Sequence, residues 1–436
     1  MSVSVSGAPR RASGAALLLW PGVLVCLAGV LLSRADVVLV GAALAGMLLL
    51  GRRGLPDVTL VVGDPTTRDD TGDRQLVGPV TVSSECPTTV LLRVTSPGAD
   101  PVAALVAVDG SRVLTACLPL ARTGRVPGYA AHGIAWNASL DTVAPLDEGR
   151  SPSAVVLPVA RRIGEVPVPQ RLRGLSGPHG SRRPGAGGDL RDVHPFAPGD
   201  RMRGIDWRTT ARRSPGLDEI YVRRTHATSE AHVVVVLDSR DDMAQDIATW
   251  TGYGEPRPDR PGSLDLARSA AASLATTFLR RGDRVGLVDL GRSGAQLRPG
   301  AGERHLRRIL HALALARPDD GTVGRTRAPA LQAGATVAVL STFLDDDAAE
   351  AALVWVARGP VVWAFDVLPP VGGVLPDDAT GLAWRVLRLE RALRLERLAA
   401  AGITVVDWSA PARDVPGPSP EQRLRMMSRV RPGGRR

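Results

Sequence analysis

Two apolar runs with a short charged break between them open the chain. Residues 15–33 carry no charged side chain, and residues 37–51 form a second, shorter apolar run. The break is Arg34-Ala35-Asp36. Because a membrane-spanning helix needs about 20 mostly apolar residues, the pattern predicts two transmembrane helices over residues 15–52, joined as a helical hairpin.

Arginine pairs flank this predicted hairpin on both sides. Arg10-Arg11 precedes it, and Arg52-Arg53 follows it. Arginines near the ends of membrane spans favour the cytoplasmic side. The pattern therefore predicts a cytoplasmic tail over residues 1–14, a multi-pass location in the cell membrane, and cytoplasmic soluble domains. A cleaved signal peptide is the alternative for the first run, but the second run favours a retained anchor.

Short alternating and β-branched runs follow over residues 57–160. They predict strands at residues 58–62, 80–82, 90–94, 102–108, 113–118 and 155–157. Asp109-Gly110, which separates two of these runs, is a typical two-residue hairpin signal. Several short strands of this kind predict a small β-sandwich-like domain, and nothing in the segment suggests catalysis. A plain spacer domain is the simplest interpretation of its role.

The second half of the chain alternates between strand and helix patterns. Residues 161–195 are rich in Pro, Gly and Arg, so residues 161–230 are assigned to a loop and a motif-bearing segment. Residues 411–436 are again rich in Pro, Gly and Arg and predict a disordered basic tail. Between them, residues 231–410 predict a doubly wound, mainly parallel α/β domain of the Rossmann-like class. Its predicted strands are 233–237, 285–290, 335–340, 361–366 and 403–407, and its predicted helices are 264–281, 303–316, 346–357 and 380–401.

A dense block of arginine and aspartate lies just before the first of these strands. Pro198-Gly199-Asp200 is a turn signal, and a tryptophan in the block offers a flat face on which a guanidinium can stack. The block has two interpretations: an internal network of ion pairs that clamps the segment onto the next domain, or a docking surface for a partner protein. The residues assigned to it are Gly199, Asp200, Arg203, Asp206, Trp207, Arg208 and Arg212.

Together with the glycine-rich stretch before it, this block resembles a known family signature. The matching residues are Gly177 to Asp189, Pro198-Gly-Asp200, Arg203, Ile205-Asp-Trp-Arg208 and Ala211-Arg212. They are similar to the signature of the DUF58 family, and the resemblance covers residues 172 to about 370. It implies a von Willebrand factor A-like domain after the signature. It also implies a MoxR-type AAA+ ATPase as partner, and a role in assembling or maturing other proteins.

The same resemblance directs attention to Asp238, at the end of the first predicted parallel strand. The von Willebrand A fold holds a divalent ion there with an Asp-x-Ser-x-Ser loop, and Mg²⁺ suits such oxygen ligands. This chain instead has Arg240 and Asp242 at the two serine positions. Ser341-Thr342 stands where an acid often follows the serine, although Asp345, Asp346 and Asp347 come just after.

Two alternatives follow for this loop. The guanidinium of Arg240 can replace the cation by pairing with Asp238 or Asp242, in which case the protein has no resident cofactor. Alternatively, Asp238 and Asp242, helped by Asp241, can bind Mg²⁺ through carboxylates alone. The metal-free arrangement is the interpretation preferred from the sequence.

Composition narrows the function classes further. The sequence contains no lysine, so all 54 basic side chains are arginine, a bias typical of GC-rich genomes such as those of actinobacteria. Without lysine, a Walker A ATPase site, a Schiff base and a pyridoxal site are impossible. The net charge of +10 raises the question of nucleic acid, but aromatic residues make up only 3%, too few for base stacking. The three cysteines form no disulfide framework, although a bridge between Cys86 and Cys117 is conceivable.

These observations predict a membrane-anchored protein that mediates interaction or assembly rather than an enzyme. The partners implied are a MoxR-type AAA+ ATPase and the lipid bilayer, with no nucleic acid. Two alternatives stay open: a metal-dependent enzyme that uses the acids around Asp238, and a cell-envelope protein whose domain faces outward.

Overall fold

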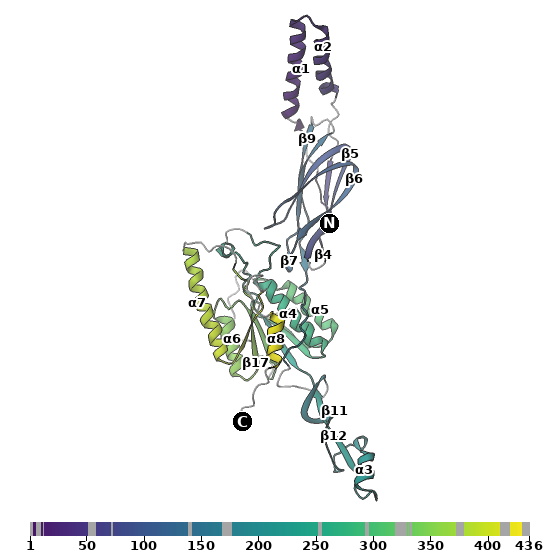
Figure 1. The fold of residues 1–436 in the computed structure, drawn as a ribbon, viewed down its shortest axis with the longest axis vertical. Helices are drawn as coiled ribbons and strands as arrows, with labels where there is room; N and C mark the ends of the chain where they lie inside the picture. The colour runs from purple at the N-terminus through teal and green to yellow at the C-terminus, as the bar shows by residue number, and fades with distance from the viewer. Residues whose placement is uncertain are drawn as a thin grey trace. The chain divides into compact units, whose positions relative to one another are not determined.

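A computed structural model of the 436-residue chain divides it into two compact units. The first comprises residues 1–156 with 254–260, and the second residues 157–253 with 261–436. Figure 1 shows the ribbon of both. The structure describes residues 3–5, 10–11, 13–50, 58–70, 73–137, 142–167, 177–251, 255–292, 296–318, 329, 331, 334–371, 379–409 and 419–429.

Two helices near the start of the first unit, α1 (Ser13–Leu31) and α2 (Ala35–Leu50), lie where a transmembrane hairpin is predicted. They have 19 and 16 residues, whereas a spanning helix typically needs about 20, within a range of about 17–25. Within the part of the chain that the structure describes, no helix is both long enough and apolar enough to cross a membrane. The predicted pair of transmembrane helices, and with it the membrane part of the predicted fold class, is therefore wrong.

The rest of the first unit is antiparallel β-structure around one apolar core. The predicted sandwich corresponds to a single eight-stranded sheet, in which β3, β5, β8 and β9 are neighbours, and a separate pair, β7 and β10. Alternate residues of β3 are buried, as expected for strands with one face on a core. The strands are β1 (Val3–Val5), β2 (Arg10–Arg11), β3 (Val58–Val62), β4 (Thr66–Asp70), β5 (Asp73–Thr95), β6 (Val102–Pro119), β7 (Gly124–Val126), β8 (Ala130–Asn137), β9 (Thr142–Arg150) and β10 (Ala154–Val156).

The hairpin predicted at Asp109-Gly110 lies elsewhere. Strands β5 and β6 pair from Gln75 with Pro119 to Val94 with Val102, so the turn between them falls after residue 95. Gly110, with a φ of 80°, lies inside β6 at the register shift in its pairing with β5. Glycine adopts this left-handed conformation at little cost. The dipeptide therefore accommodates an irregularity within one long strand instead of ending it.

The second unit is built on a six-stranded sheet in the order β15-β14-β13-β16-β17-β18. All neighbouring pairs are parallel except β14 and β15, which are antiparallel at one edge. Strand β13 is buried on both faces along its valine run, which is typical of a central parallel strand. The strands are β13 (His232–Leu237), β14 (Arg284–Asp289), β15 (Gln296–Gly300), β16 (Thr336–Ser341), β17 (Val361–Asp366) and β18 (Thr404–Asp407).

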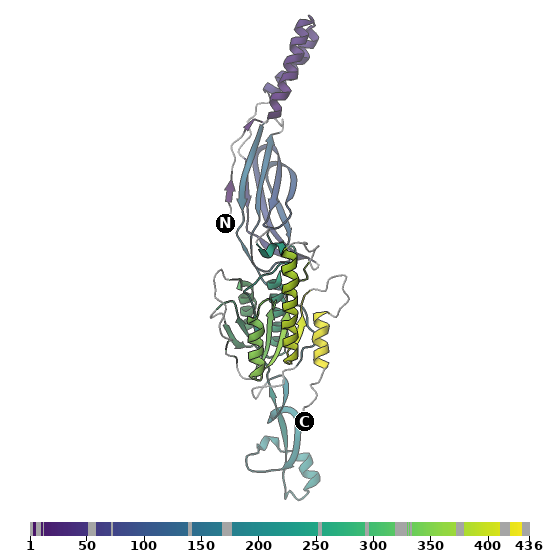
Figure 2. The same cartoon turned by 90° about the vertical axis from the view of Figure 1, so that its left-hand side faces the viewer.

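Helices cover both faces of this sheet (Figures 1 and 2). Helices α4 (Ser263–Arg280), α5 (Glu303–Leu315) and α8 (Pro420–Arg429) share a core with Val233 and Val235 of β13. Helices α6 (Asp347–Ala357) and α7 (Ala379–Ala400) share a second core with Val234 and Val236 on the opposite face. Helix α8 lies within the segment predicted to be a disordered tail, and it is held there because Leu424 is fully buried.

A two-stranded ribbon, here called the arm (residues 177–230), precedes β13. Its strands β11 (His179–Pro195) and β12 (Tyr221–Ser229) pair antiparallel, with three register shifts in the glycine-rich part. Between them lie a 3₁₀ turn, η1 (Met202–Gly204), and helix α3 (Trp207–Arg213). The sequence predicts a loop over residues 161–195. In the structure, residues 179–195 of that segment form strand β11, because they pair with β12. Strand β12 begins 26 positions after the end of β11.

Candidate functional site

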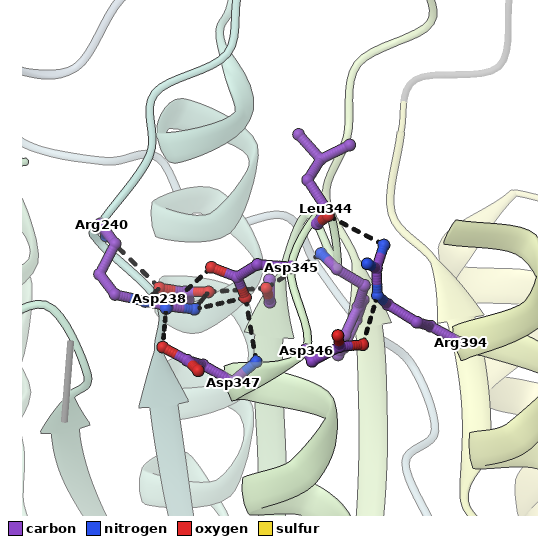
Figure 3. A network of polar contacts seen from close by, with 9 residues as sticks. Asp238, Arg240, Leu344, Asp345, Asp346, Asp347 and Arg394 are labelled. Carbon is purple, nitrogen blue, oxygen red and sulfur yellow. Dashed lines mark hydrogen bonds and ion pairs between the residues drawn. The ribbon is translucent and has the colours of Figure 1, made fainter. Parts of the chain in front are cut away.

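The carboxyl ends of β13 and β16 lie at the point where the strand order of the sheet reverses. The chain passes from β13 to β14 on one side and later to β16 on the other side of β13. Open α/β sheets bind their ligands at such a point. Asp238 directly follows β13, and Ser341 ends β16. The loop after β16 and the first residue of α6 bring Asp345 and Asp347 to the same place (Figure 3).

Arg240 lies among the carboxylates of Asp238, Asp345 and Asp347, here called the acidic cluster (Figure 3). Its Nε and Nη2 donate to the two oxygens of Asp238 at 2.8 and 2.9 Å. Its Nη1 lies 2.8 Å from Asp345 and 2.6 Å from Asp347. Ser341 adds a hydroxyl hydrogen bond of 2.7 Å to Asp238. The single guanidinium therefore contacts all three carboxylates and partly offsets their charge.

Burial makes these charges depend on one another. The side chain of Asp238 is 4% exposed and that of Arg240 is 16% exposed. Burial disfavours the charged form of Arg240, but the hydrogen bond to Asp238 and its charge outweigh burial, so the pKa of Arg240 is raised. Burial, followed by the charges of Asp238 and Asp345, also raises the pKa of Asp241 beside the cluster. A single guanidinium thus leaves an excess of negative charge here.

The two predicted metal ligands are engaged in different contacts. Asp238 binds Arg240, whereas Asp242 accepts a hydrogen bond of 3.3 Å from the amide of Leu264 at the start of α4. In the described ranges, no group of three or more His, Cys, Asp or Glu side chains has an arrangement that could hold a metal ion. With Arg240 in place, the acidic cluster does not fit a divalent ion. The pairing of Arg240 with Asp238 is one of the two pairings that the sequence offered for this guanidinium.

Other strand ends carry acids that the sequence did not single out. Asp289, at the end of β14, accepts a hydrogen bond of 2.6 Å from Ser239, and burial raises its pKa. Asp366, at the end of β17, pairs with Arg391 of α7; burial outweighs this pairing and raises its pKa. In the sequence, both acids stand at the end of an apolar run, and this position could have identified them as residues at the carboxyl edge of the sheet.

Helix α7 contributes a second arginine to the loop after β16. Arg394 donates to Asp346 at 2.6 Å and to the carbonyl oxygen of Leu344 at 2.9 Å (Figure 3). This hydrogen bond lowers the pKa of Asp346. No pattern in the sequence connects Arg394 with a loop almost fifty residues earlier.

Asp200 fixes the turn at the start of the arginine and aspartate block. It accepts hydrogen bonds from the amide of Ala197 at 2.9 Å and from Arg224 of β12 at 3.0 Å. The backbone hydrogen bond, and then Arg224, lower its pKa. Gly199 has a φ of 98°, which glycine adopts without steric cost. The partner of Asp200 thus lies outside the block, on the neighbouring strand.

Asp206 is the N-cap residue of helix α3. Its Oδ1 accepts a hydrogen bond of 3.0 Å from the amide of Thr209, and this bond lowers its pKa. Its own amide donates to the carbonyl oxygen of Tyr221 at 2.8 Å, so the cap is also joined to β12. An aspartate in this position satisfies amides that the first helical turn leaves free.

The arginines of the block do not form the predicted internal network. Arg203, Arg208 and Arg212 are exposed, and none of them has an ion pair with a residue that the structure describes. Trp207 is 62% exposed and Met202 is 76% exposed. The sequence left open whether the block is a clamp or a docking surface. In the structure, its aspartates hold the backbone, while its arginines and Trp207 face solvent and are here called the arginine surface.

Comparison with known proteins gives one family match and distant relatives. The family model of DUF58, described as a protein of unknown function, matches residues 192–401, which include the block, strands β13 to β17 of the sheet, and α7. Uncharacterized proteins of Mycobacterium bovis and Mycobacterium tuberculosis are each 29% identical over 281 residues, covering 60% of this chain and 83% of theirs.

A solved structure also matches over most of the chain. It is an active-site mutant of a family two carbohydrate esterase from Clostridium thermocellum, with 10% identity, coverage of 86% of this chain and 95% of that chain, and a TM-score of 0.16. A score this low carries no argument about fold or activity.

Proposed function

We propose that this protein, whose residues 192–401 match the DUF58 family model, is an interaction or assembly factor that docks a partner protein through its arm. The observation that carries the proposal is the arginine surface, in which Arg203, Trp207, Arg208 and Arg212 are all exposed. These side chains are not used to hold the arm together, because Asp200 and Asp206 and their backbone partners do that.

Residue types support a docking role for this surface. Tryptophan and arginine are enriched among the residues that contribute most to protein interfaces, and guanidinium groups pair with carboxylates in two parallel hydrogen bonds. Arg208 and Arg212 are four residues apart on α3, so they lie on one side of the helix. The partner should therefore present a carboxylate-rich surface with an apolar spot for Trp207.

The resemblance to DUF58 proteins suggests which partner this is. We propose a MoxR-type AAA+ ATPase, or a client that such an ATPase remodels, as the docked protein. The second unit would act as a von Willebrand A-like module. The parallel sheet with an acid at its switch point is consistent with that assignment. Because Arg240 already neutralises Asp238, docking at this module would not require Mg²⁺.

The test is binding of the full chain to the MoxR-type ATPase of the same organism. Reversing three charges, Arg203, Arg208 and Arg212 to Glu, should weaken binding by more than tenfold, and higher salt should weaken wild-type binding. The matched control reverses Arg304, Arg307 and Arg308, which are exposed on α5. The proposal is wrong if both triple variants bind like the wild type, or if both lose binding equally.

A further inference from the structure

Helix α7 has two apolar faces, of which the fold uses one. Trp384 and Leu398 are buried against the second unit, and Leu387 and Leu395 pack beside them. At 3.6 residues per turn, these positions share one side of the helix. Figures 1 and 2 show α7 on the outside of the sheet, on the face that it shares with α6.

The other apolar face points to solvent. Leu382, Val386, Leu389 and Leu393 are 57%, 49%, 64% and 61% exposed. Their spacing of four, three and four residues puts them in a single row about half a turn away from the buried side. We call this row the α7 stripe. Surface helices usually show one apolar stripe that faces their own core, so a second, exposed stripe needs a partner.

The spacing of the α7 stripe is that of a heptad repeat. With Leu382 and Leu389 at d positions, Val386 and Leu393 fall at a positions. Val386 at one a position, with leucine at both d positions, matches the pattern that favours parallel, two-stranded coiled coils, whereas Leu393 at the other a position is not β-branched. We propose that α7 of two copies of this chain pair in parallel through the stripe as a short coiled coil.

Charges beside the stripe complement each other in the same arrangement. Arg385 takes a g position and Glu390 the e position of the next heptad, and both are exposed. In a parallel pair, a g residue meets the e residue five positions later on the other helix. Each Arg385 therefore meets Glu390 of the second copy, twice by symmetry. Antiparallel pairing would put g beside g and e beside e, so these two residues would not meet.

Within its own chain, neither residue has a strong partner. Glu390 has a 3.8 Å contact with Arg394, and Arg385 has no ion pair with a residue in the described ranges. Both are available for contacts between copies. The proposal concerns a different surface from the arginine surface of the arm, so it goes beyond the proposed function and does not depend on it.

The length of the stripe sets the expected affinity. About two heptads bury much less than the roughly 1,600 Å² of a standard interface. We therefore expect a monomer–dimer equilibrium with a dissociation constant in the micromolar range. Sedimentation velocity of the full chain from low to high micromolar concentrations should show the weight-average mass rising toward that of a dimer.

Four variants, one of them a control on β6, test the stripe and its orientation. Val386→Glu with Leu389→Glu should leave a monomer, whereas Leu105→Glu, which changes a leucine 68% exposed on β6, should dimerise like the wild type. Arg385→Glu should weaken the dimer at least threefold, and adding Glu390→Arg should restore it. Melting temperatures show whether each variant is folded.

Cross-linking fixes the orientation. In a background with Cys26, Cys86 and Cys117 changed to Ser, Leu389→Cys should form a disulfide-linked dimer, since equal positions meet in a parallel pair. The proposal is overturned if the wild type stays monomeric at high micromolar concentration, or if the Glu variants still dimerise. It is also overturned if Leu389→Cys cross-links only with Val386→Cys, which would indicate antiparallel pairing.

Discussion

Replacing Arg240 with Ala should destabilise the second unit, because Asp238 would lose its cation. The Asp238 side chain is 4% exposed, and both of its oxygens accept hydrogen bonds from Arg240. After the substitution, the hydroxyl of Ser341 still donates a hydrogen bond to Asp238. A buried carboxylate without a cation is costly in a medium of low polarity.

The size of the effect follows from how exposed each partner is. Removing one member of a buried ion pair typically costs about 3–5 kcal/mol, and exposed pairs contribute about 0–1 kcal/mol. Asp345 and Asp347 are 47% and 52% exposed, so they add little. We expect the free energy of unfolding to fall by about 3 kcal/mol, almost all of it through Asp238. Arg394→Ala is the matched control: Arg394 is 13% exposed, but its partner Asp346 is 56% exposed, so the loss should be about 1 kcal/mol.

Urea unfolding followed by tryptophan fluorescence measures this difference, because Trp363 and Trp408 are buried in the core of the second unit. The measurement is repeated in EDTA and in millimolar Mg²⁺. Wild-type stability should not change, whereas Arg240→Ala exposes carboxylates that Mg²⁺ can neutralise. A ligand at a hundred times its dissociation constant adds about 2.7 kcal/mol.

Two results would refute the reasoning about the acidic cluster. The first is an Arg240→Ala variant that unfolds at the same urea concentration as the wild type. The second is a wild-type protein that Mg²⁺ stabilises and that loses this response in Asp238→Ala, because the ion would then bind where Arg240 is placed.

Three further predictions concern single residues. Asp241→Asn should raise the melting temperature at pH 7. Because the pKa of Asp241 is raised from its ordinary value of 3.8, its contribution to folding stability is fully present below that value and is lost as the pH rises. The gain in melting temperature from Asp241→Asn should therefore vanish below about pH 4, and a gain that persists there would contradict the argument. Arg268→Ala should cost about 3–5 kcal/mol, because Arg268 is 6% exposed, pairs with Asp265 and donates to the carbonyls at the end of α5; an unchanged urea midpoint would show otherwise. Asp206→Ala should speed hydrogen exchange of the α3 amides, since losing an N-cap costs about 1 kcal/mol, while the exposed Arg208→Ala should not; equal rates in both variants would disprove the capping role.

The strands of the second unit could be located from the sequence because their signal is local. The valine run at residues 233–236 is buried on both faces, and the sequence pattern placed a strand there to within one residue. Helices between such runs have apolar residues three and four apart, as in α4. Strand pairing is different, because it depends on which segments meet. Asp109-Gly110 was therefore misassigned as a turn, although it lies inside β6.

The two apolar runs of the first unit show that an apolar sequence does not by itself predict a membrane-spanning helix. The runs at residues 15–33 and 37–51 do form helices, but α1 and α2 end at 19 and 16 residues. The sequence pattern predicted helices here, but no helix in the described part of the chain is both long enough and apolar enough to cross a membrane.

For the candidate sites too, the sequence identified contacts between near neighbours but not those between residues far apart in the chain. The sequence alone identified Asp238 and Arg240 as neighbours two residues apart, and it offered their pairing as one of two arrangements. It could not identify Arg391 and Arg394, which reach the end of the sheet from α7, nor show that the block's arginines face solvent while its aspartates hold the backbone. Side-chain partners far apart in the chain are chosen by packing, because an ion pair forms only where the fold brings both charges within a few ångströms. Only the tertiary structure decided those contacts.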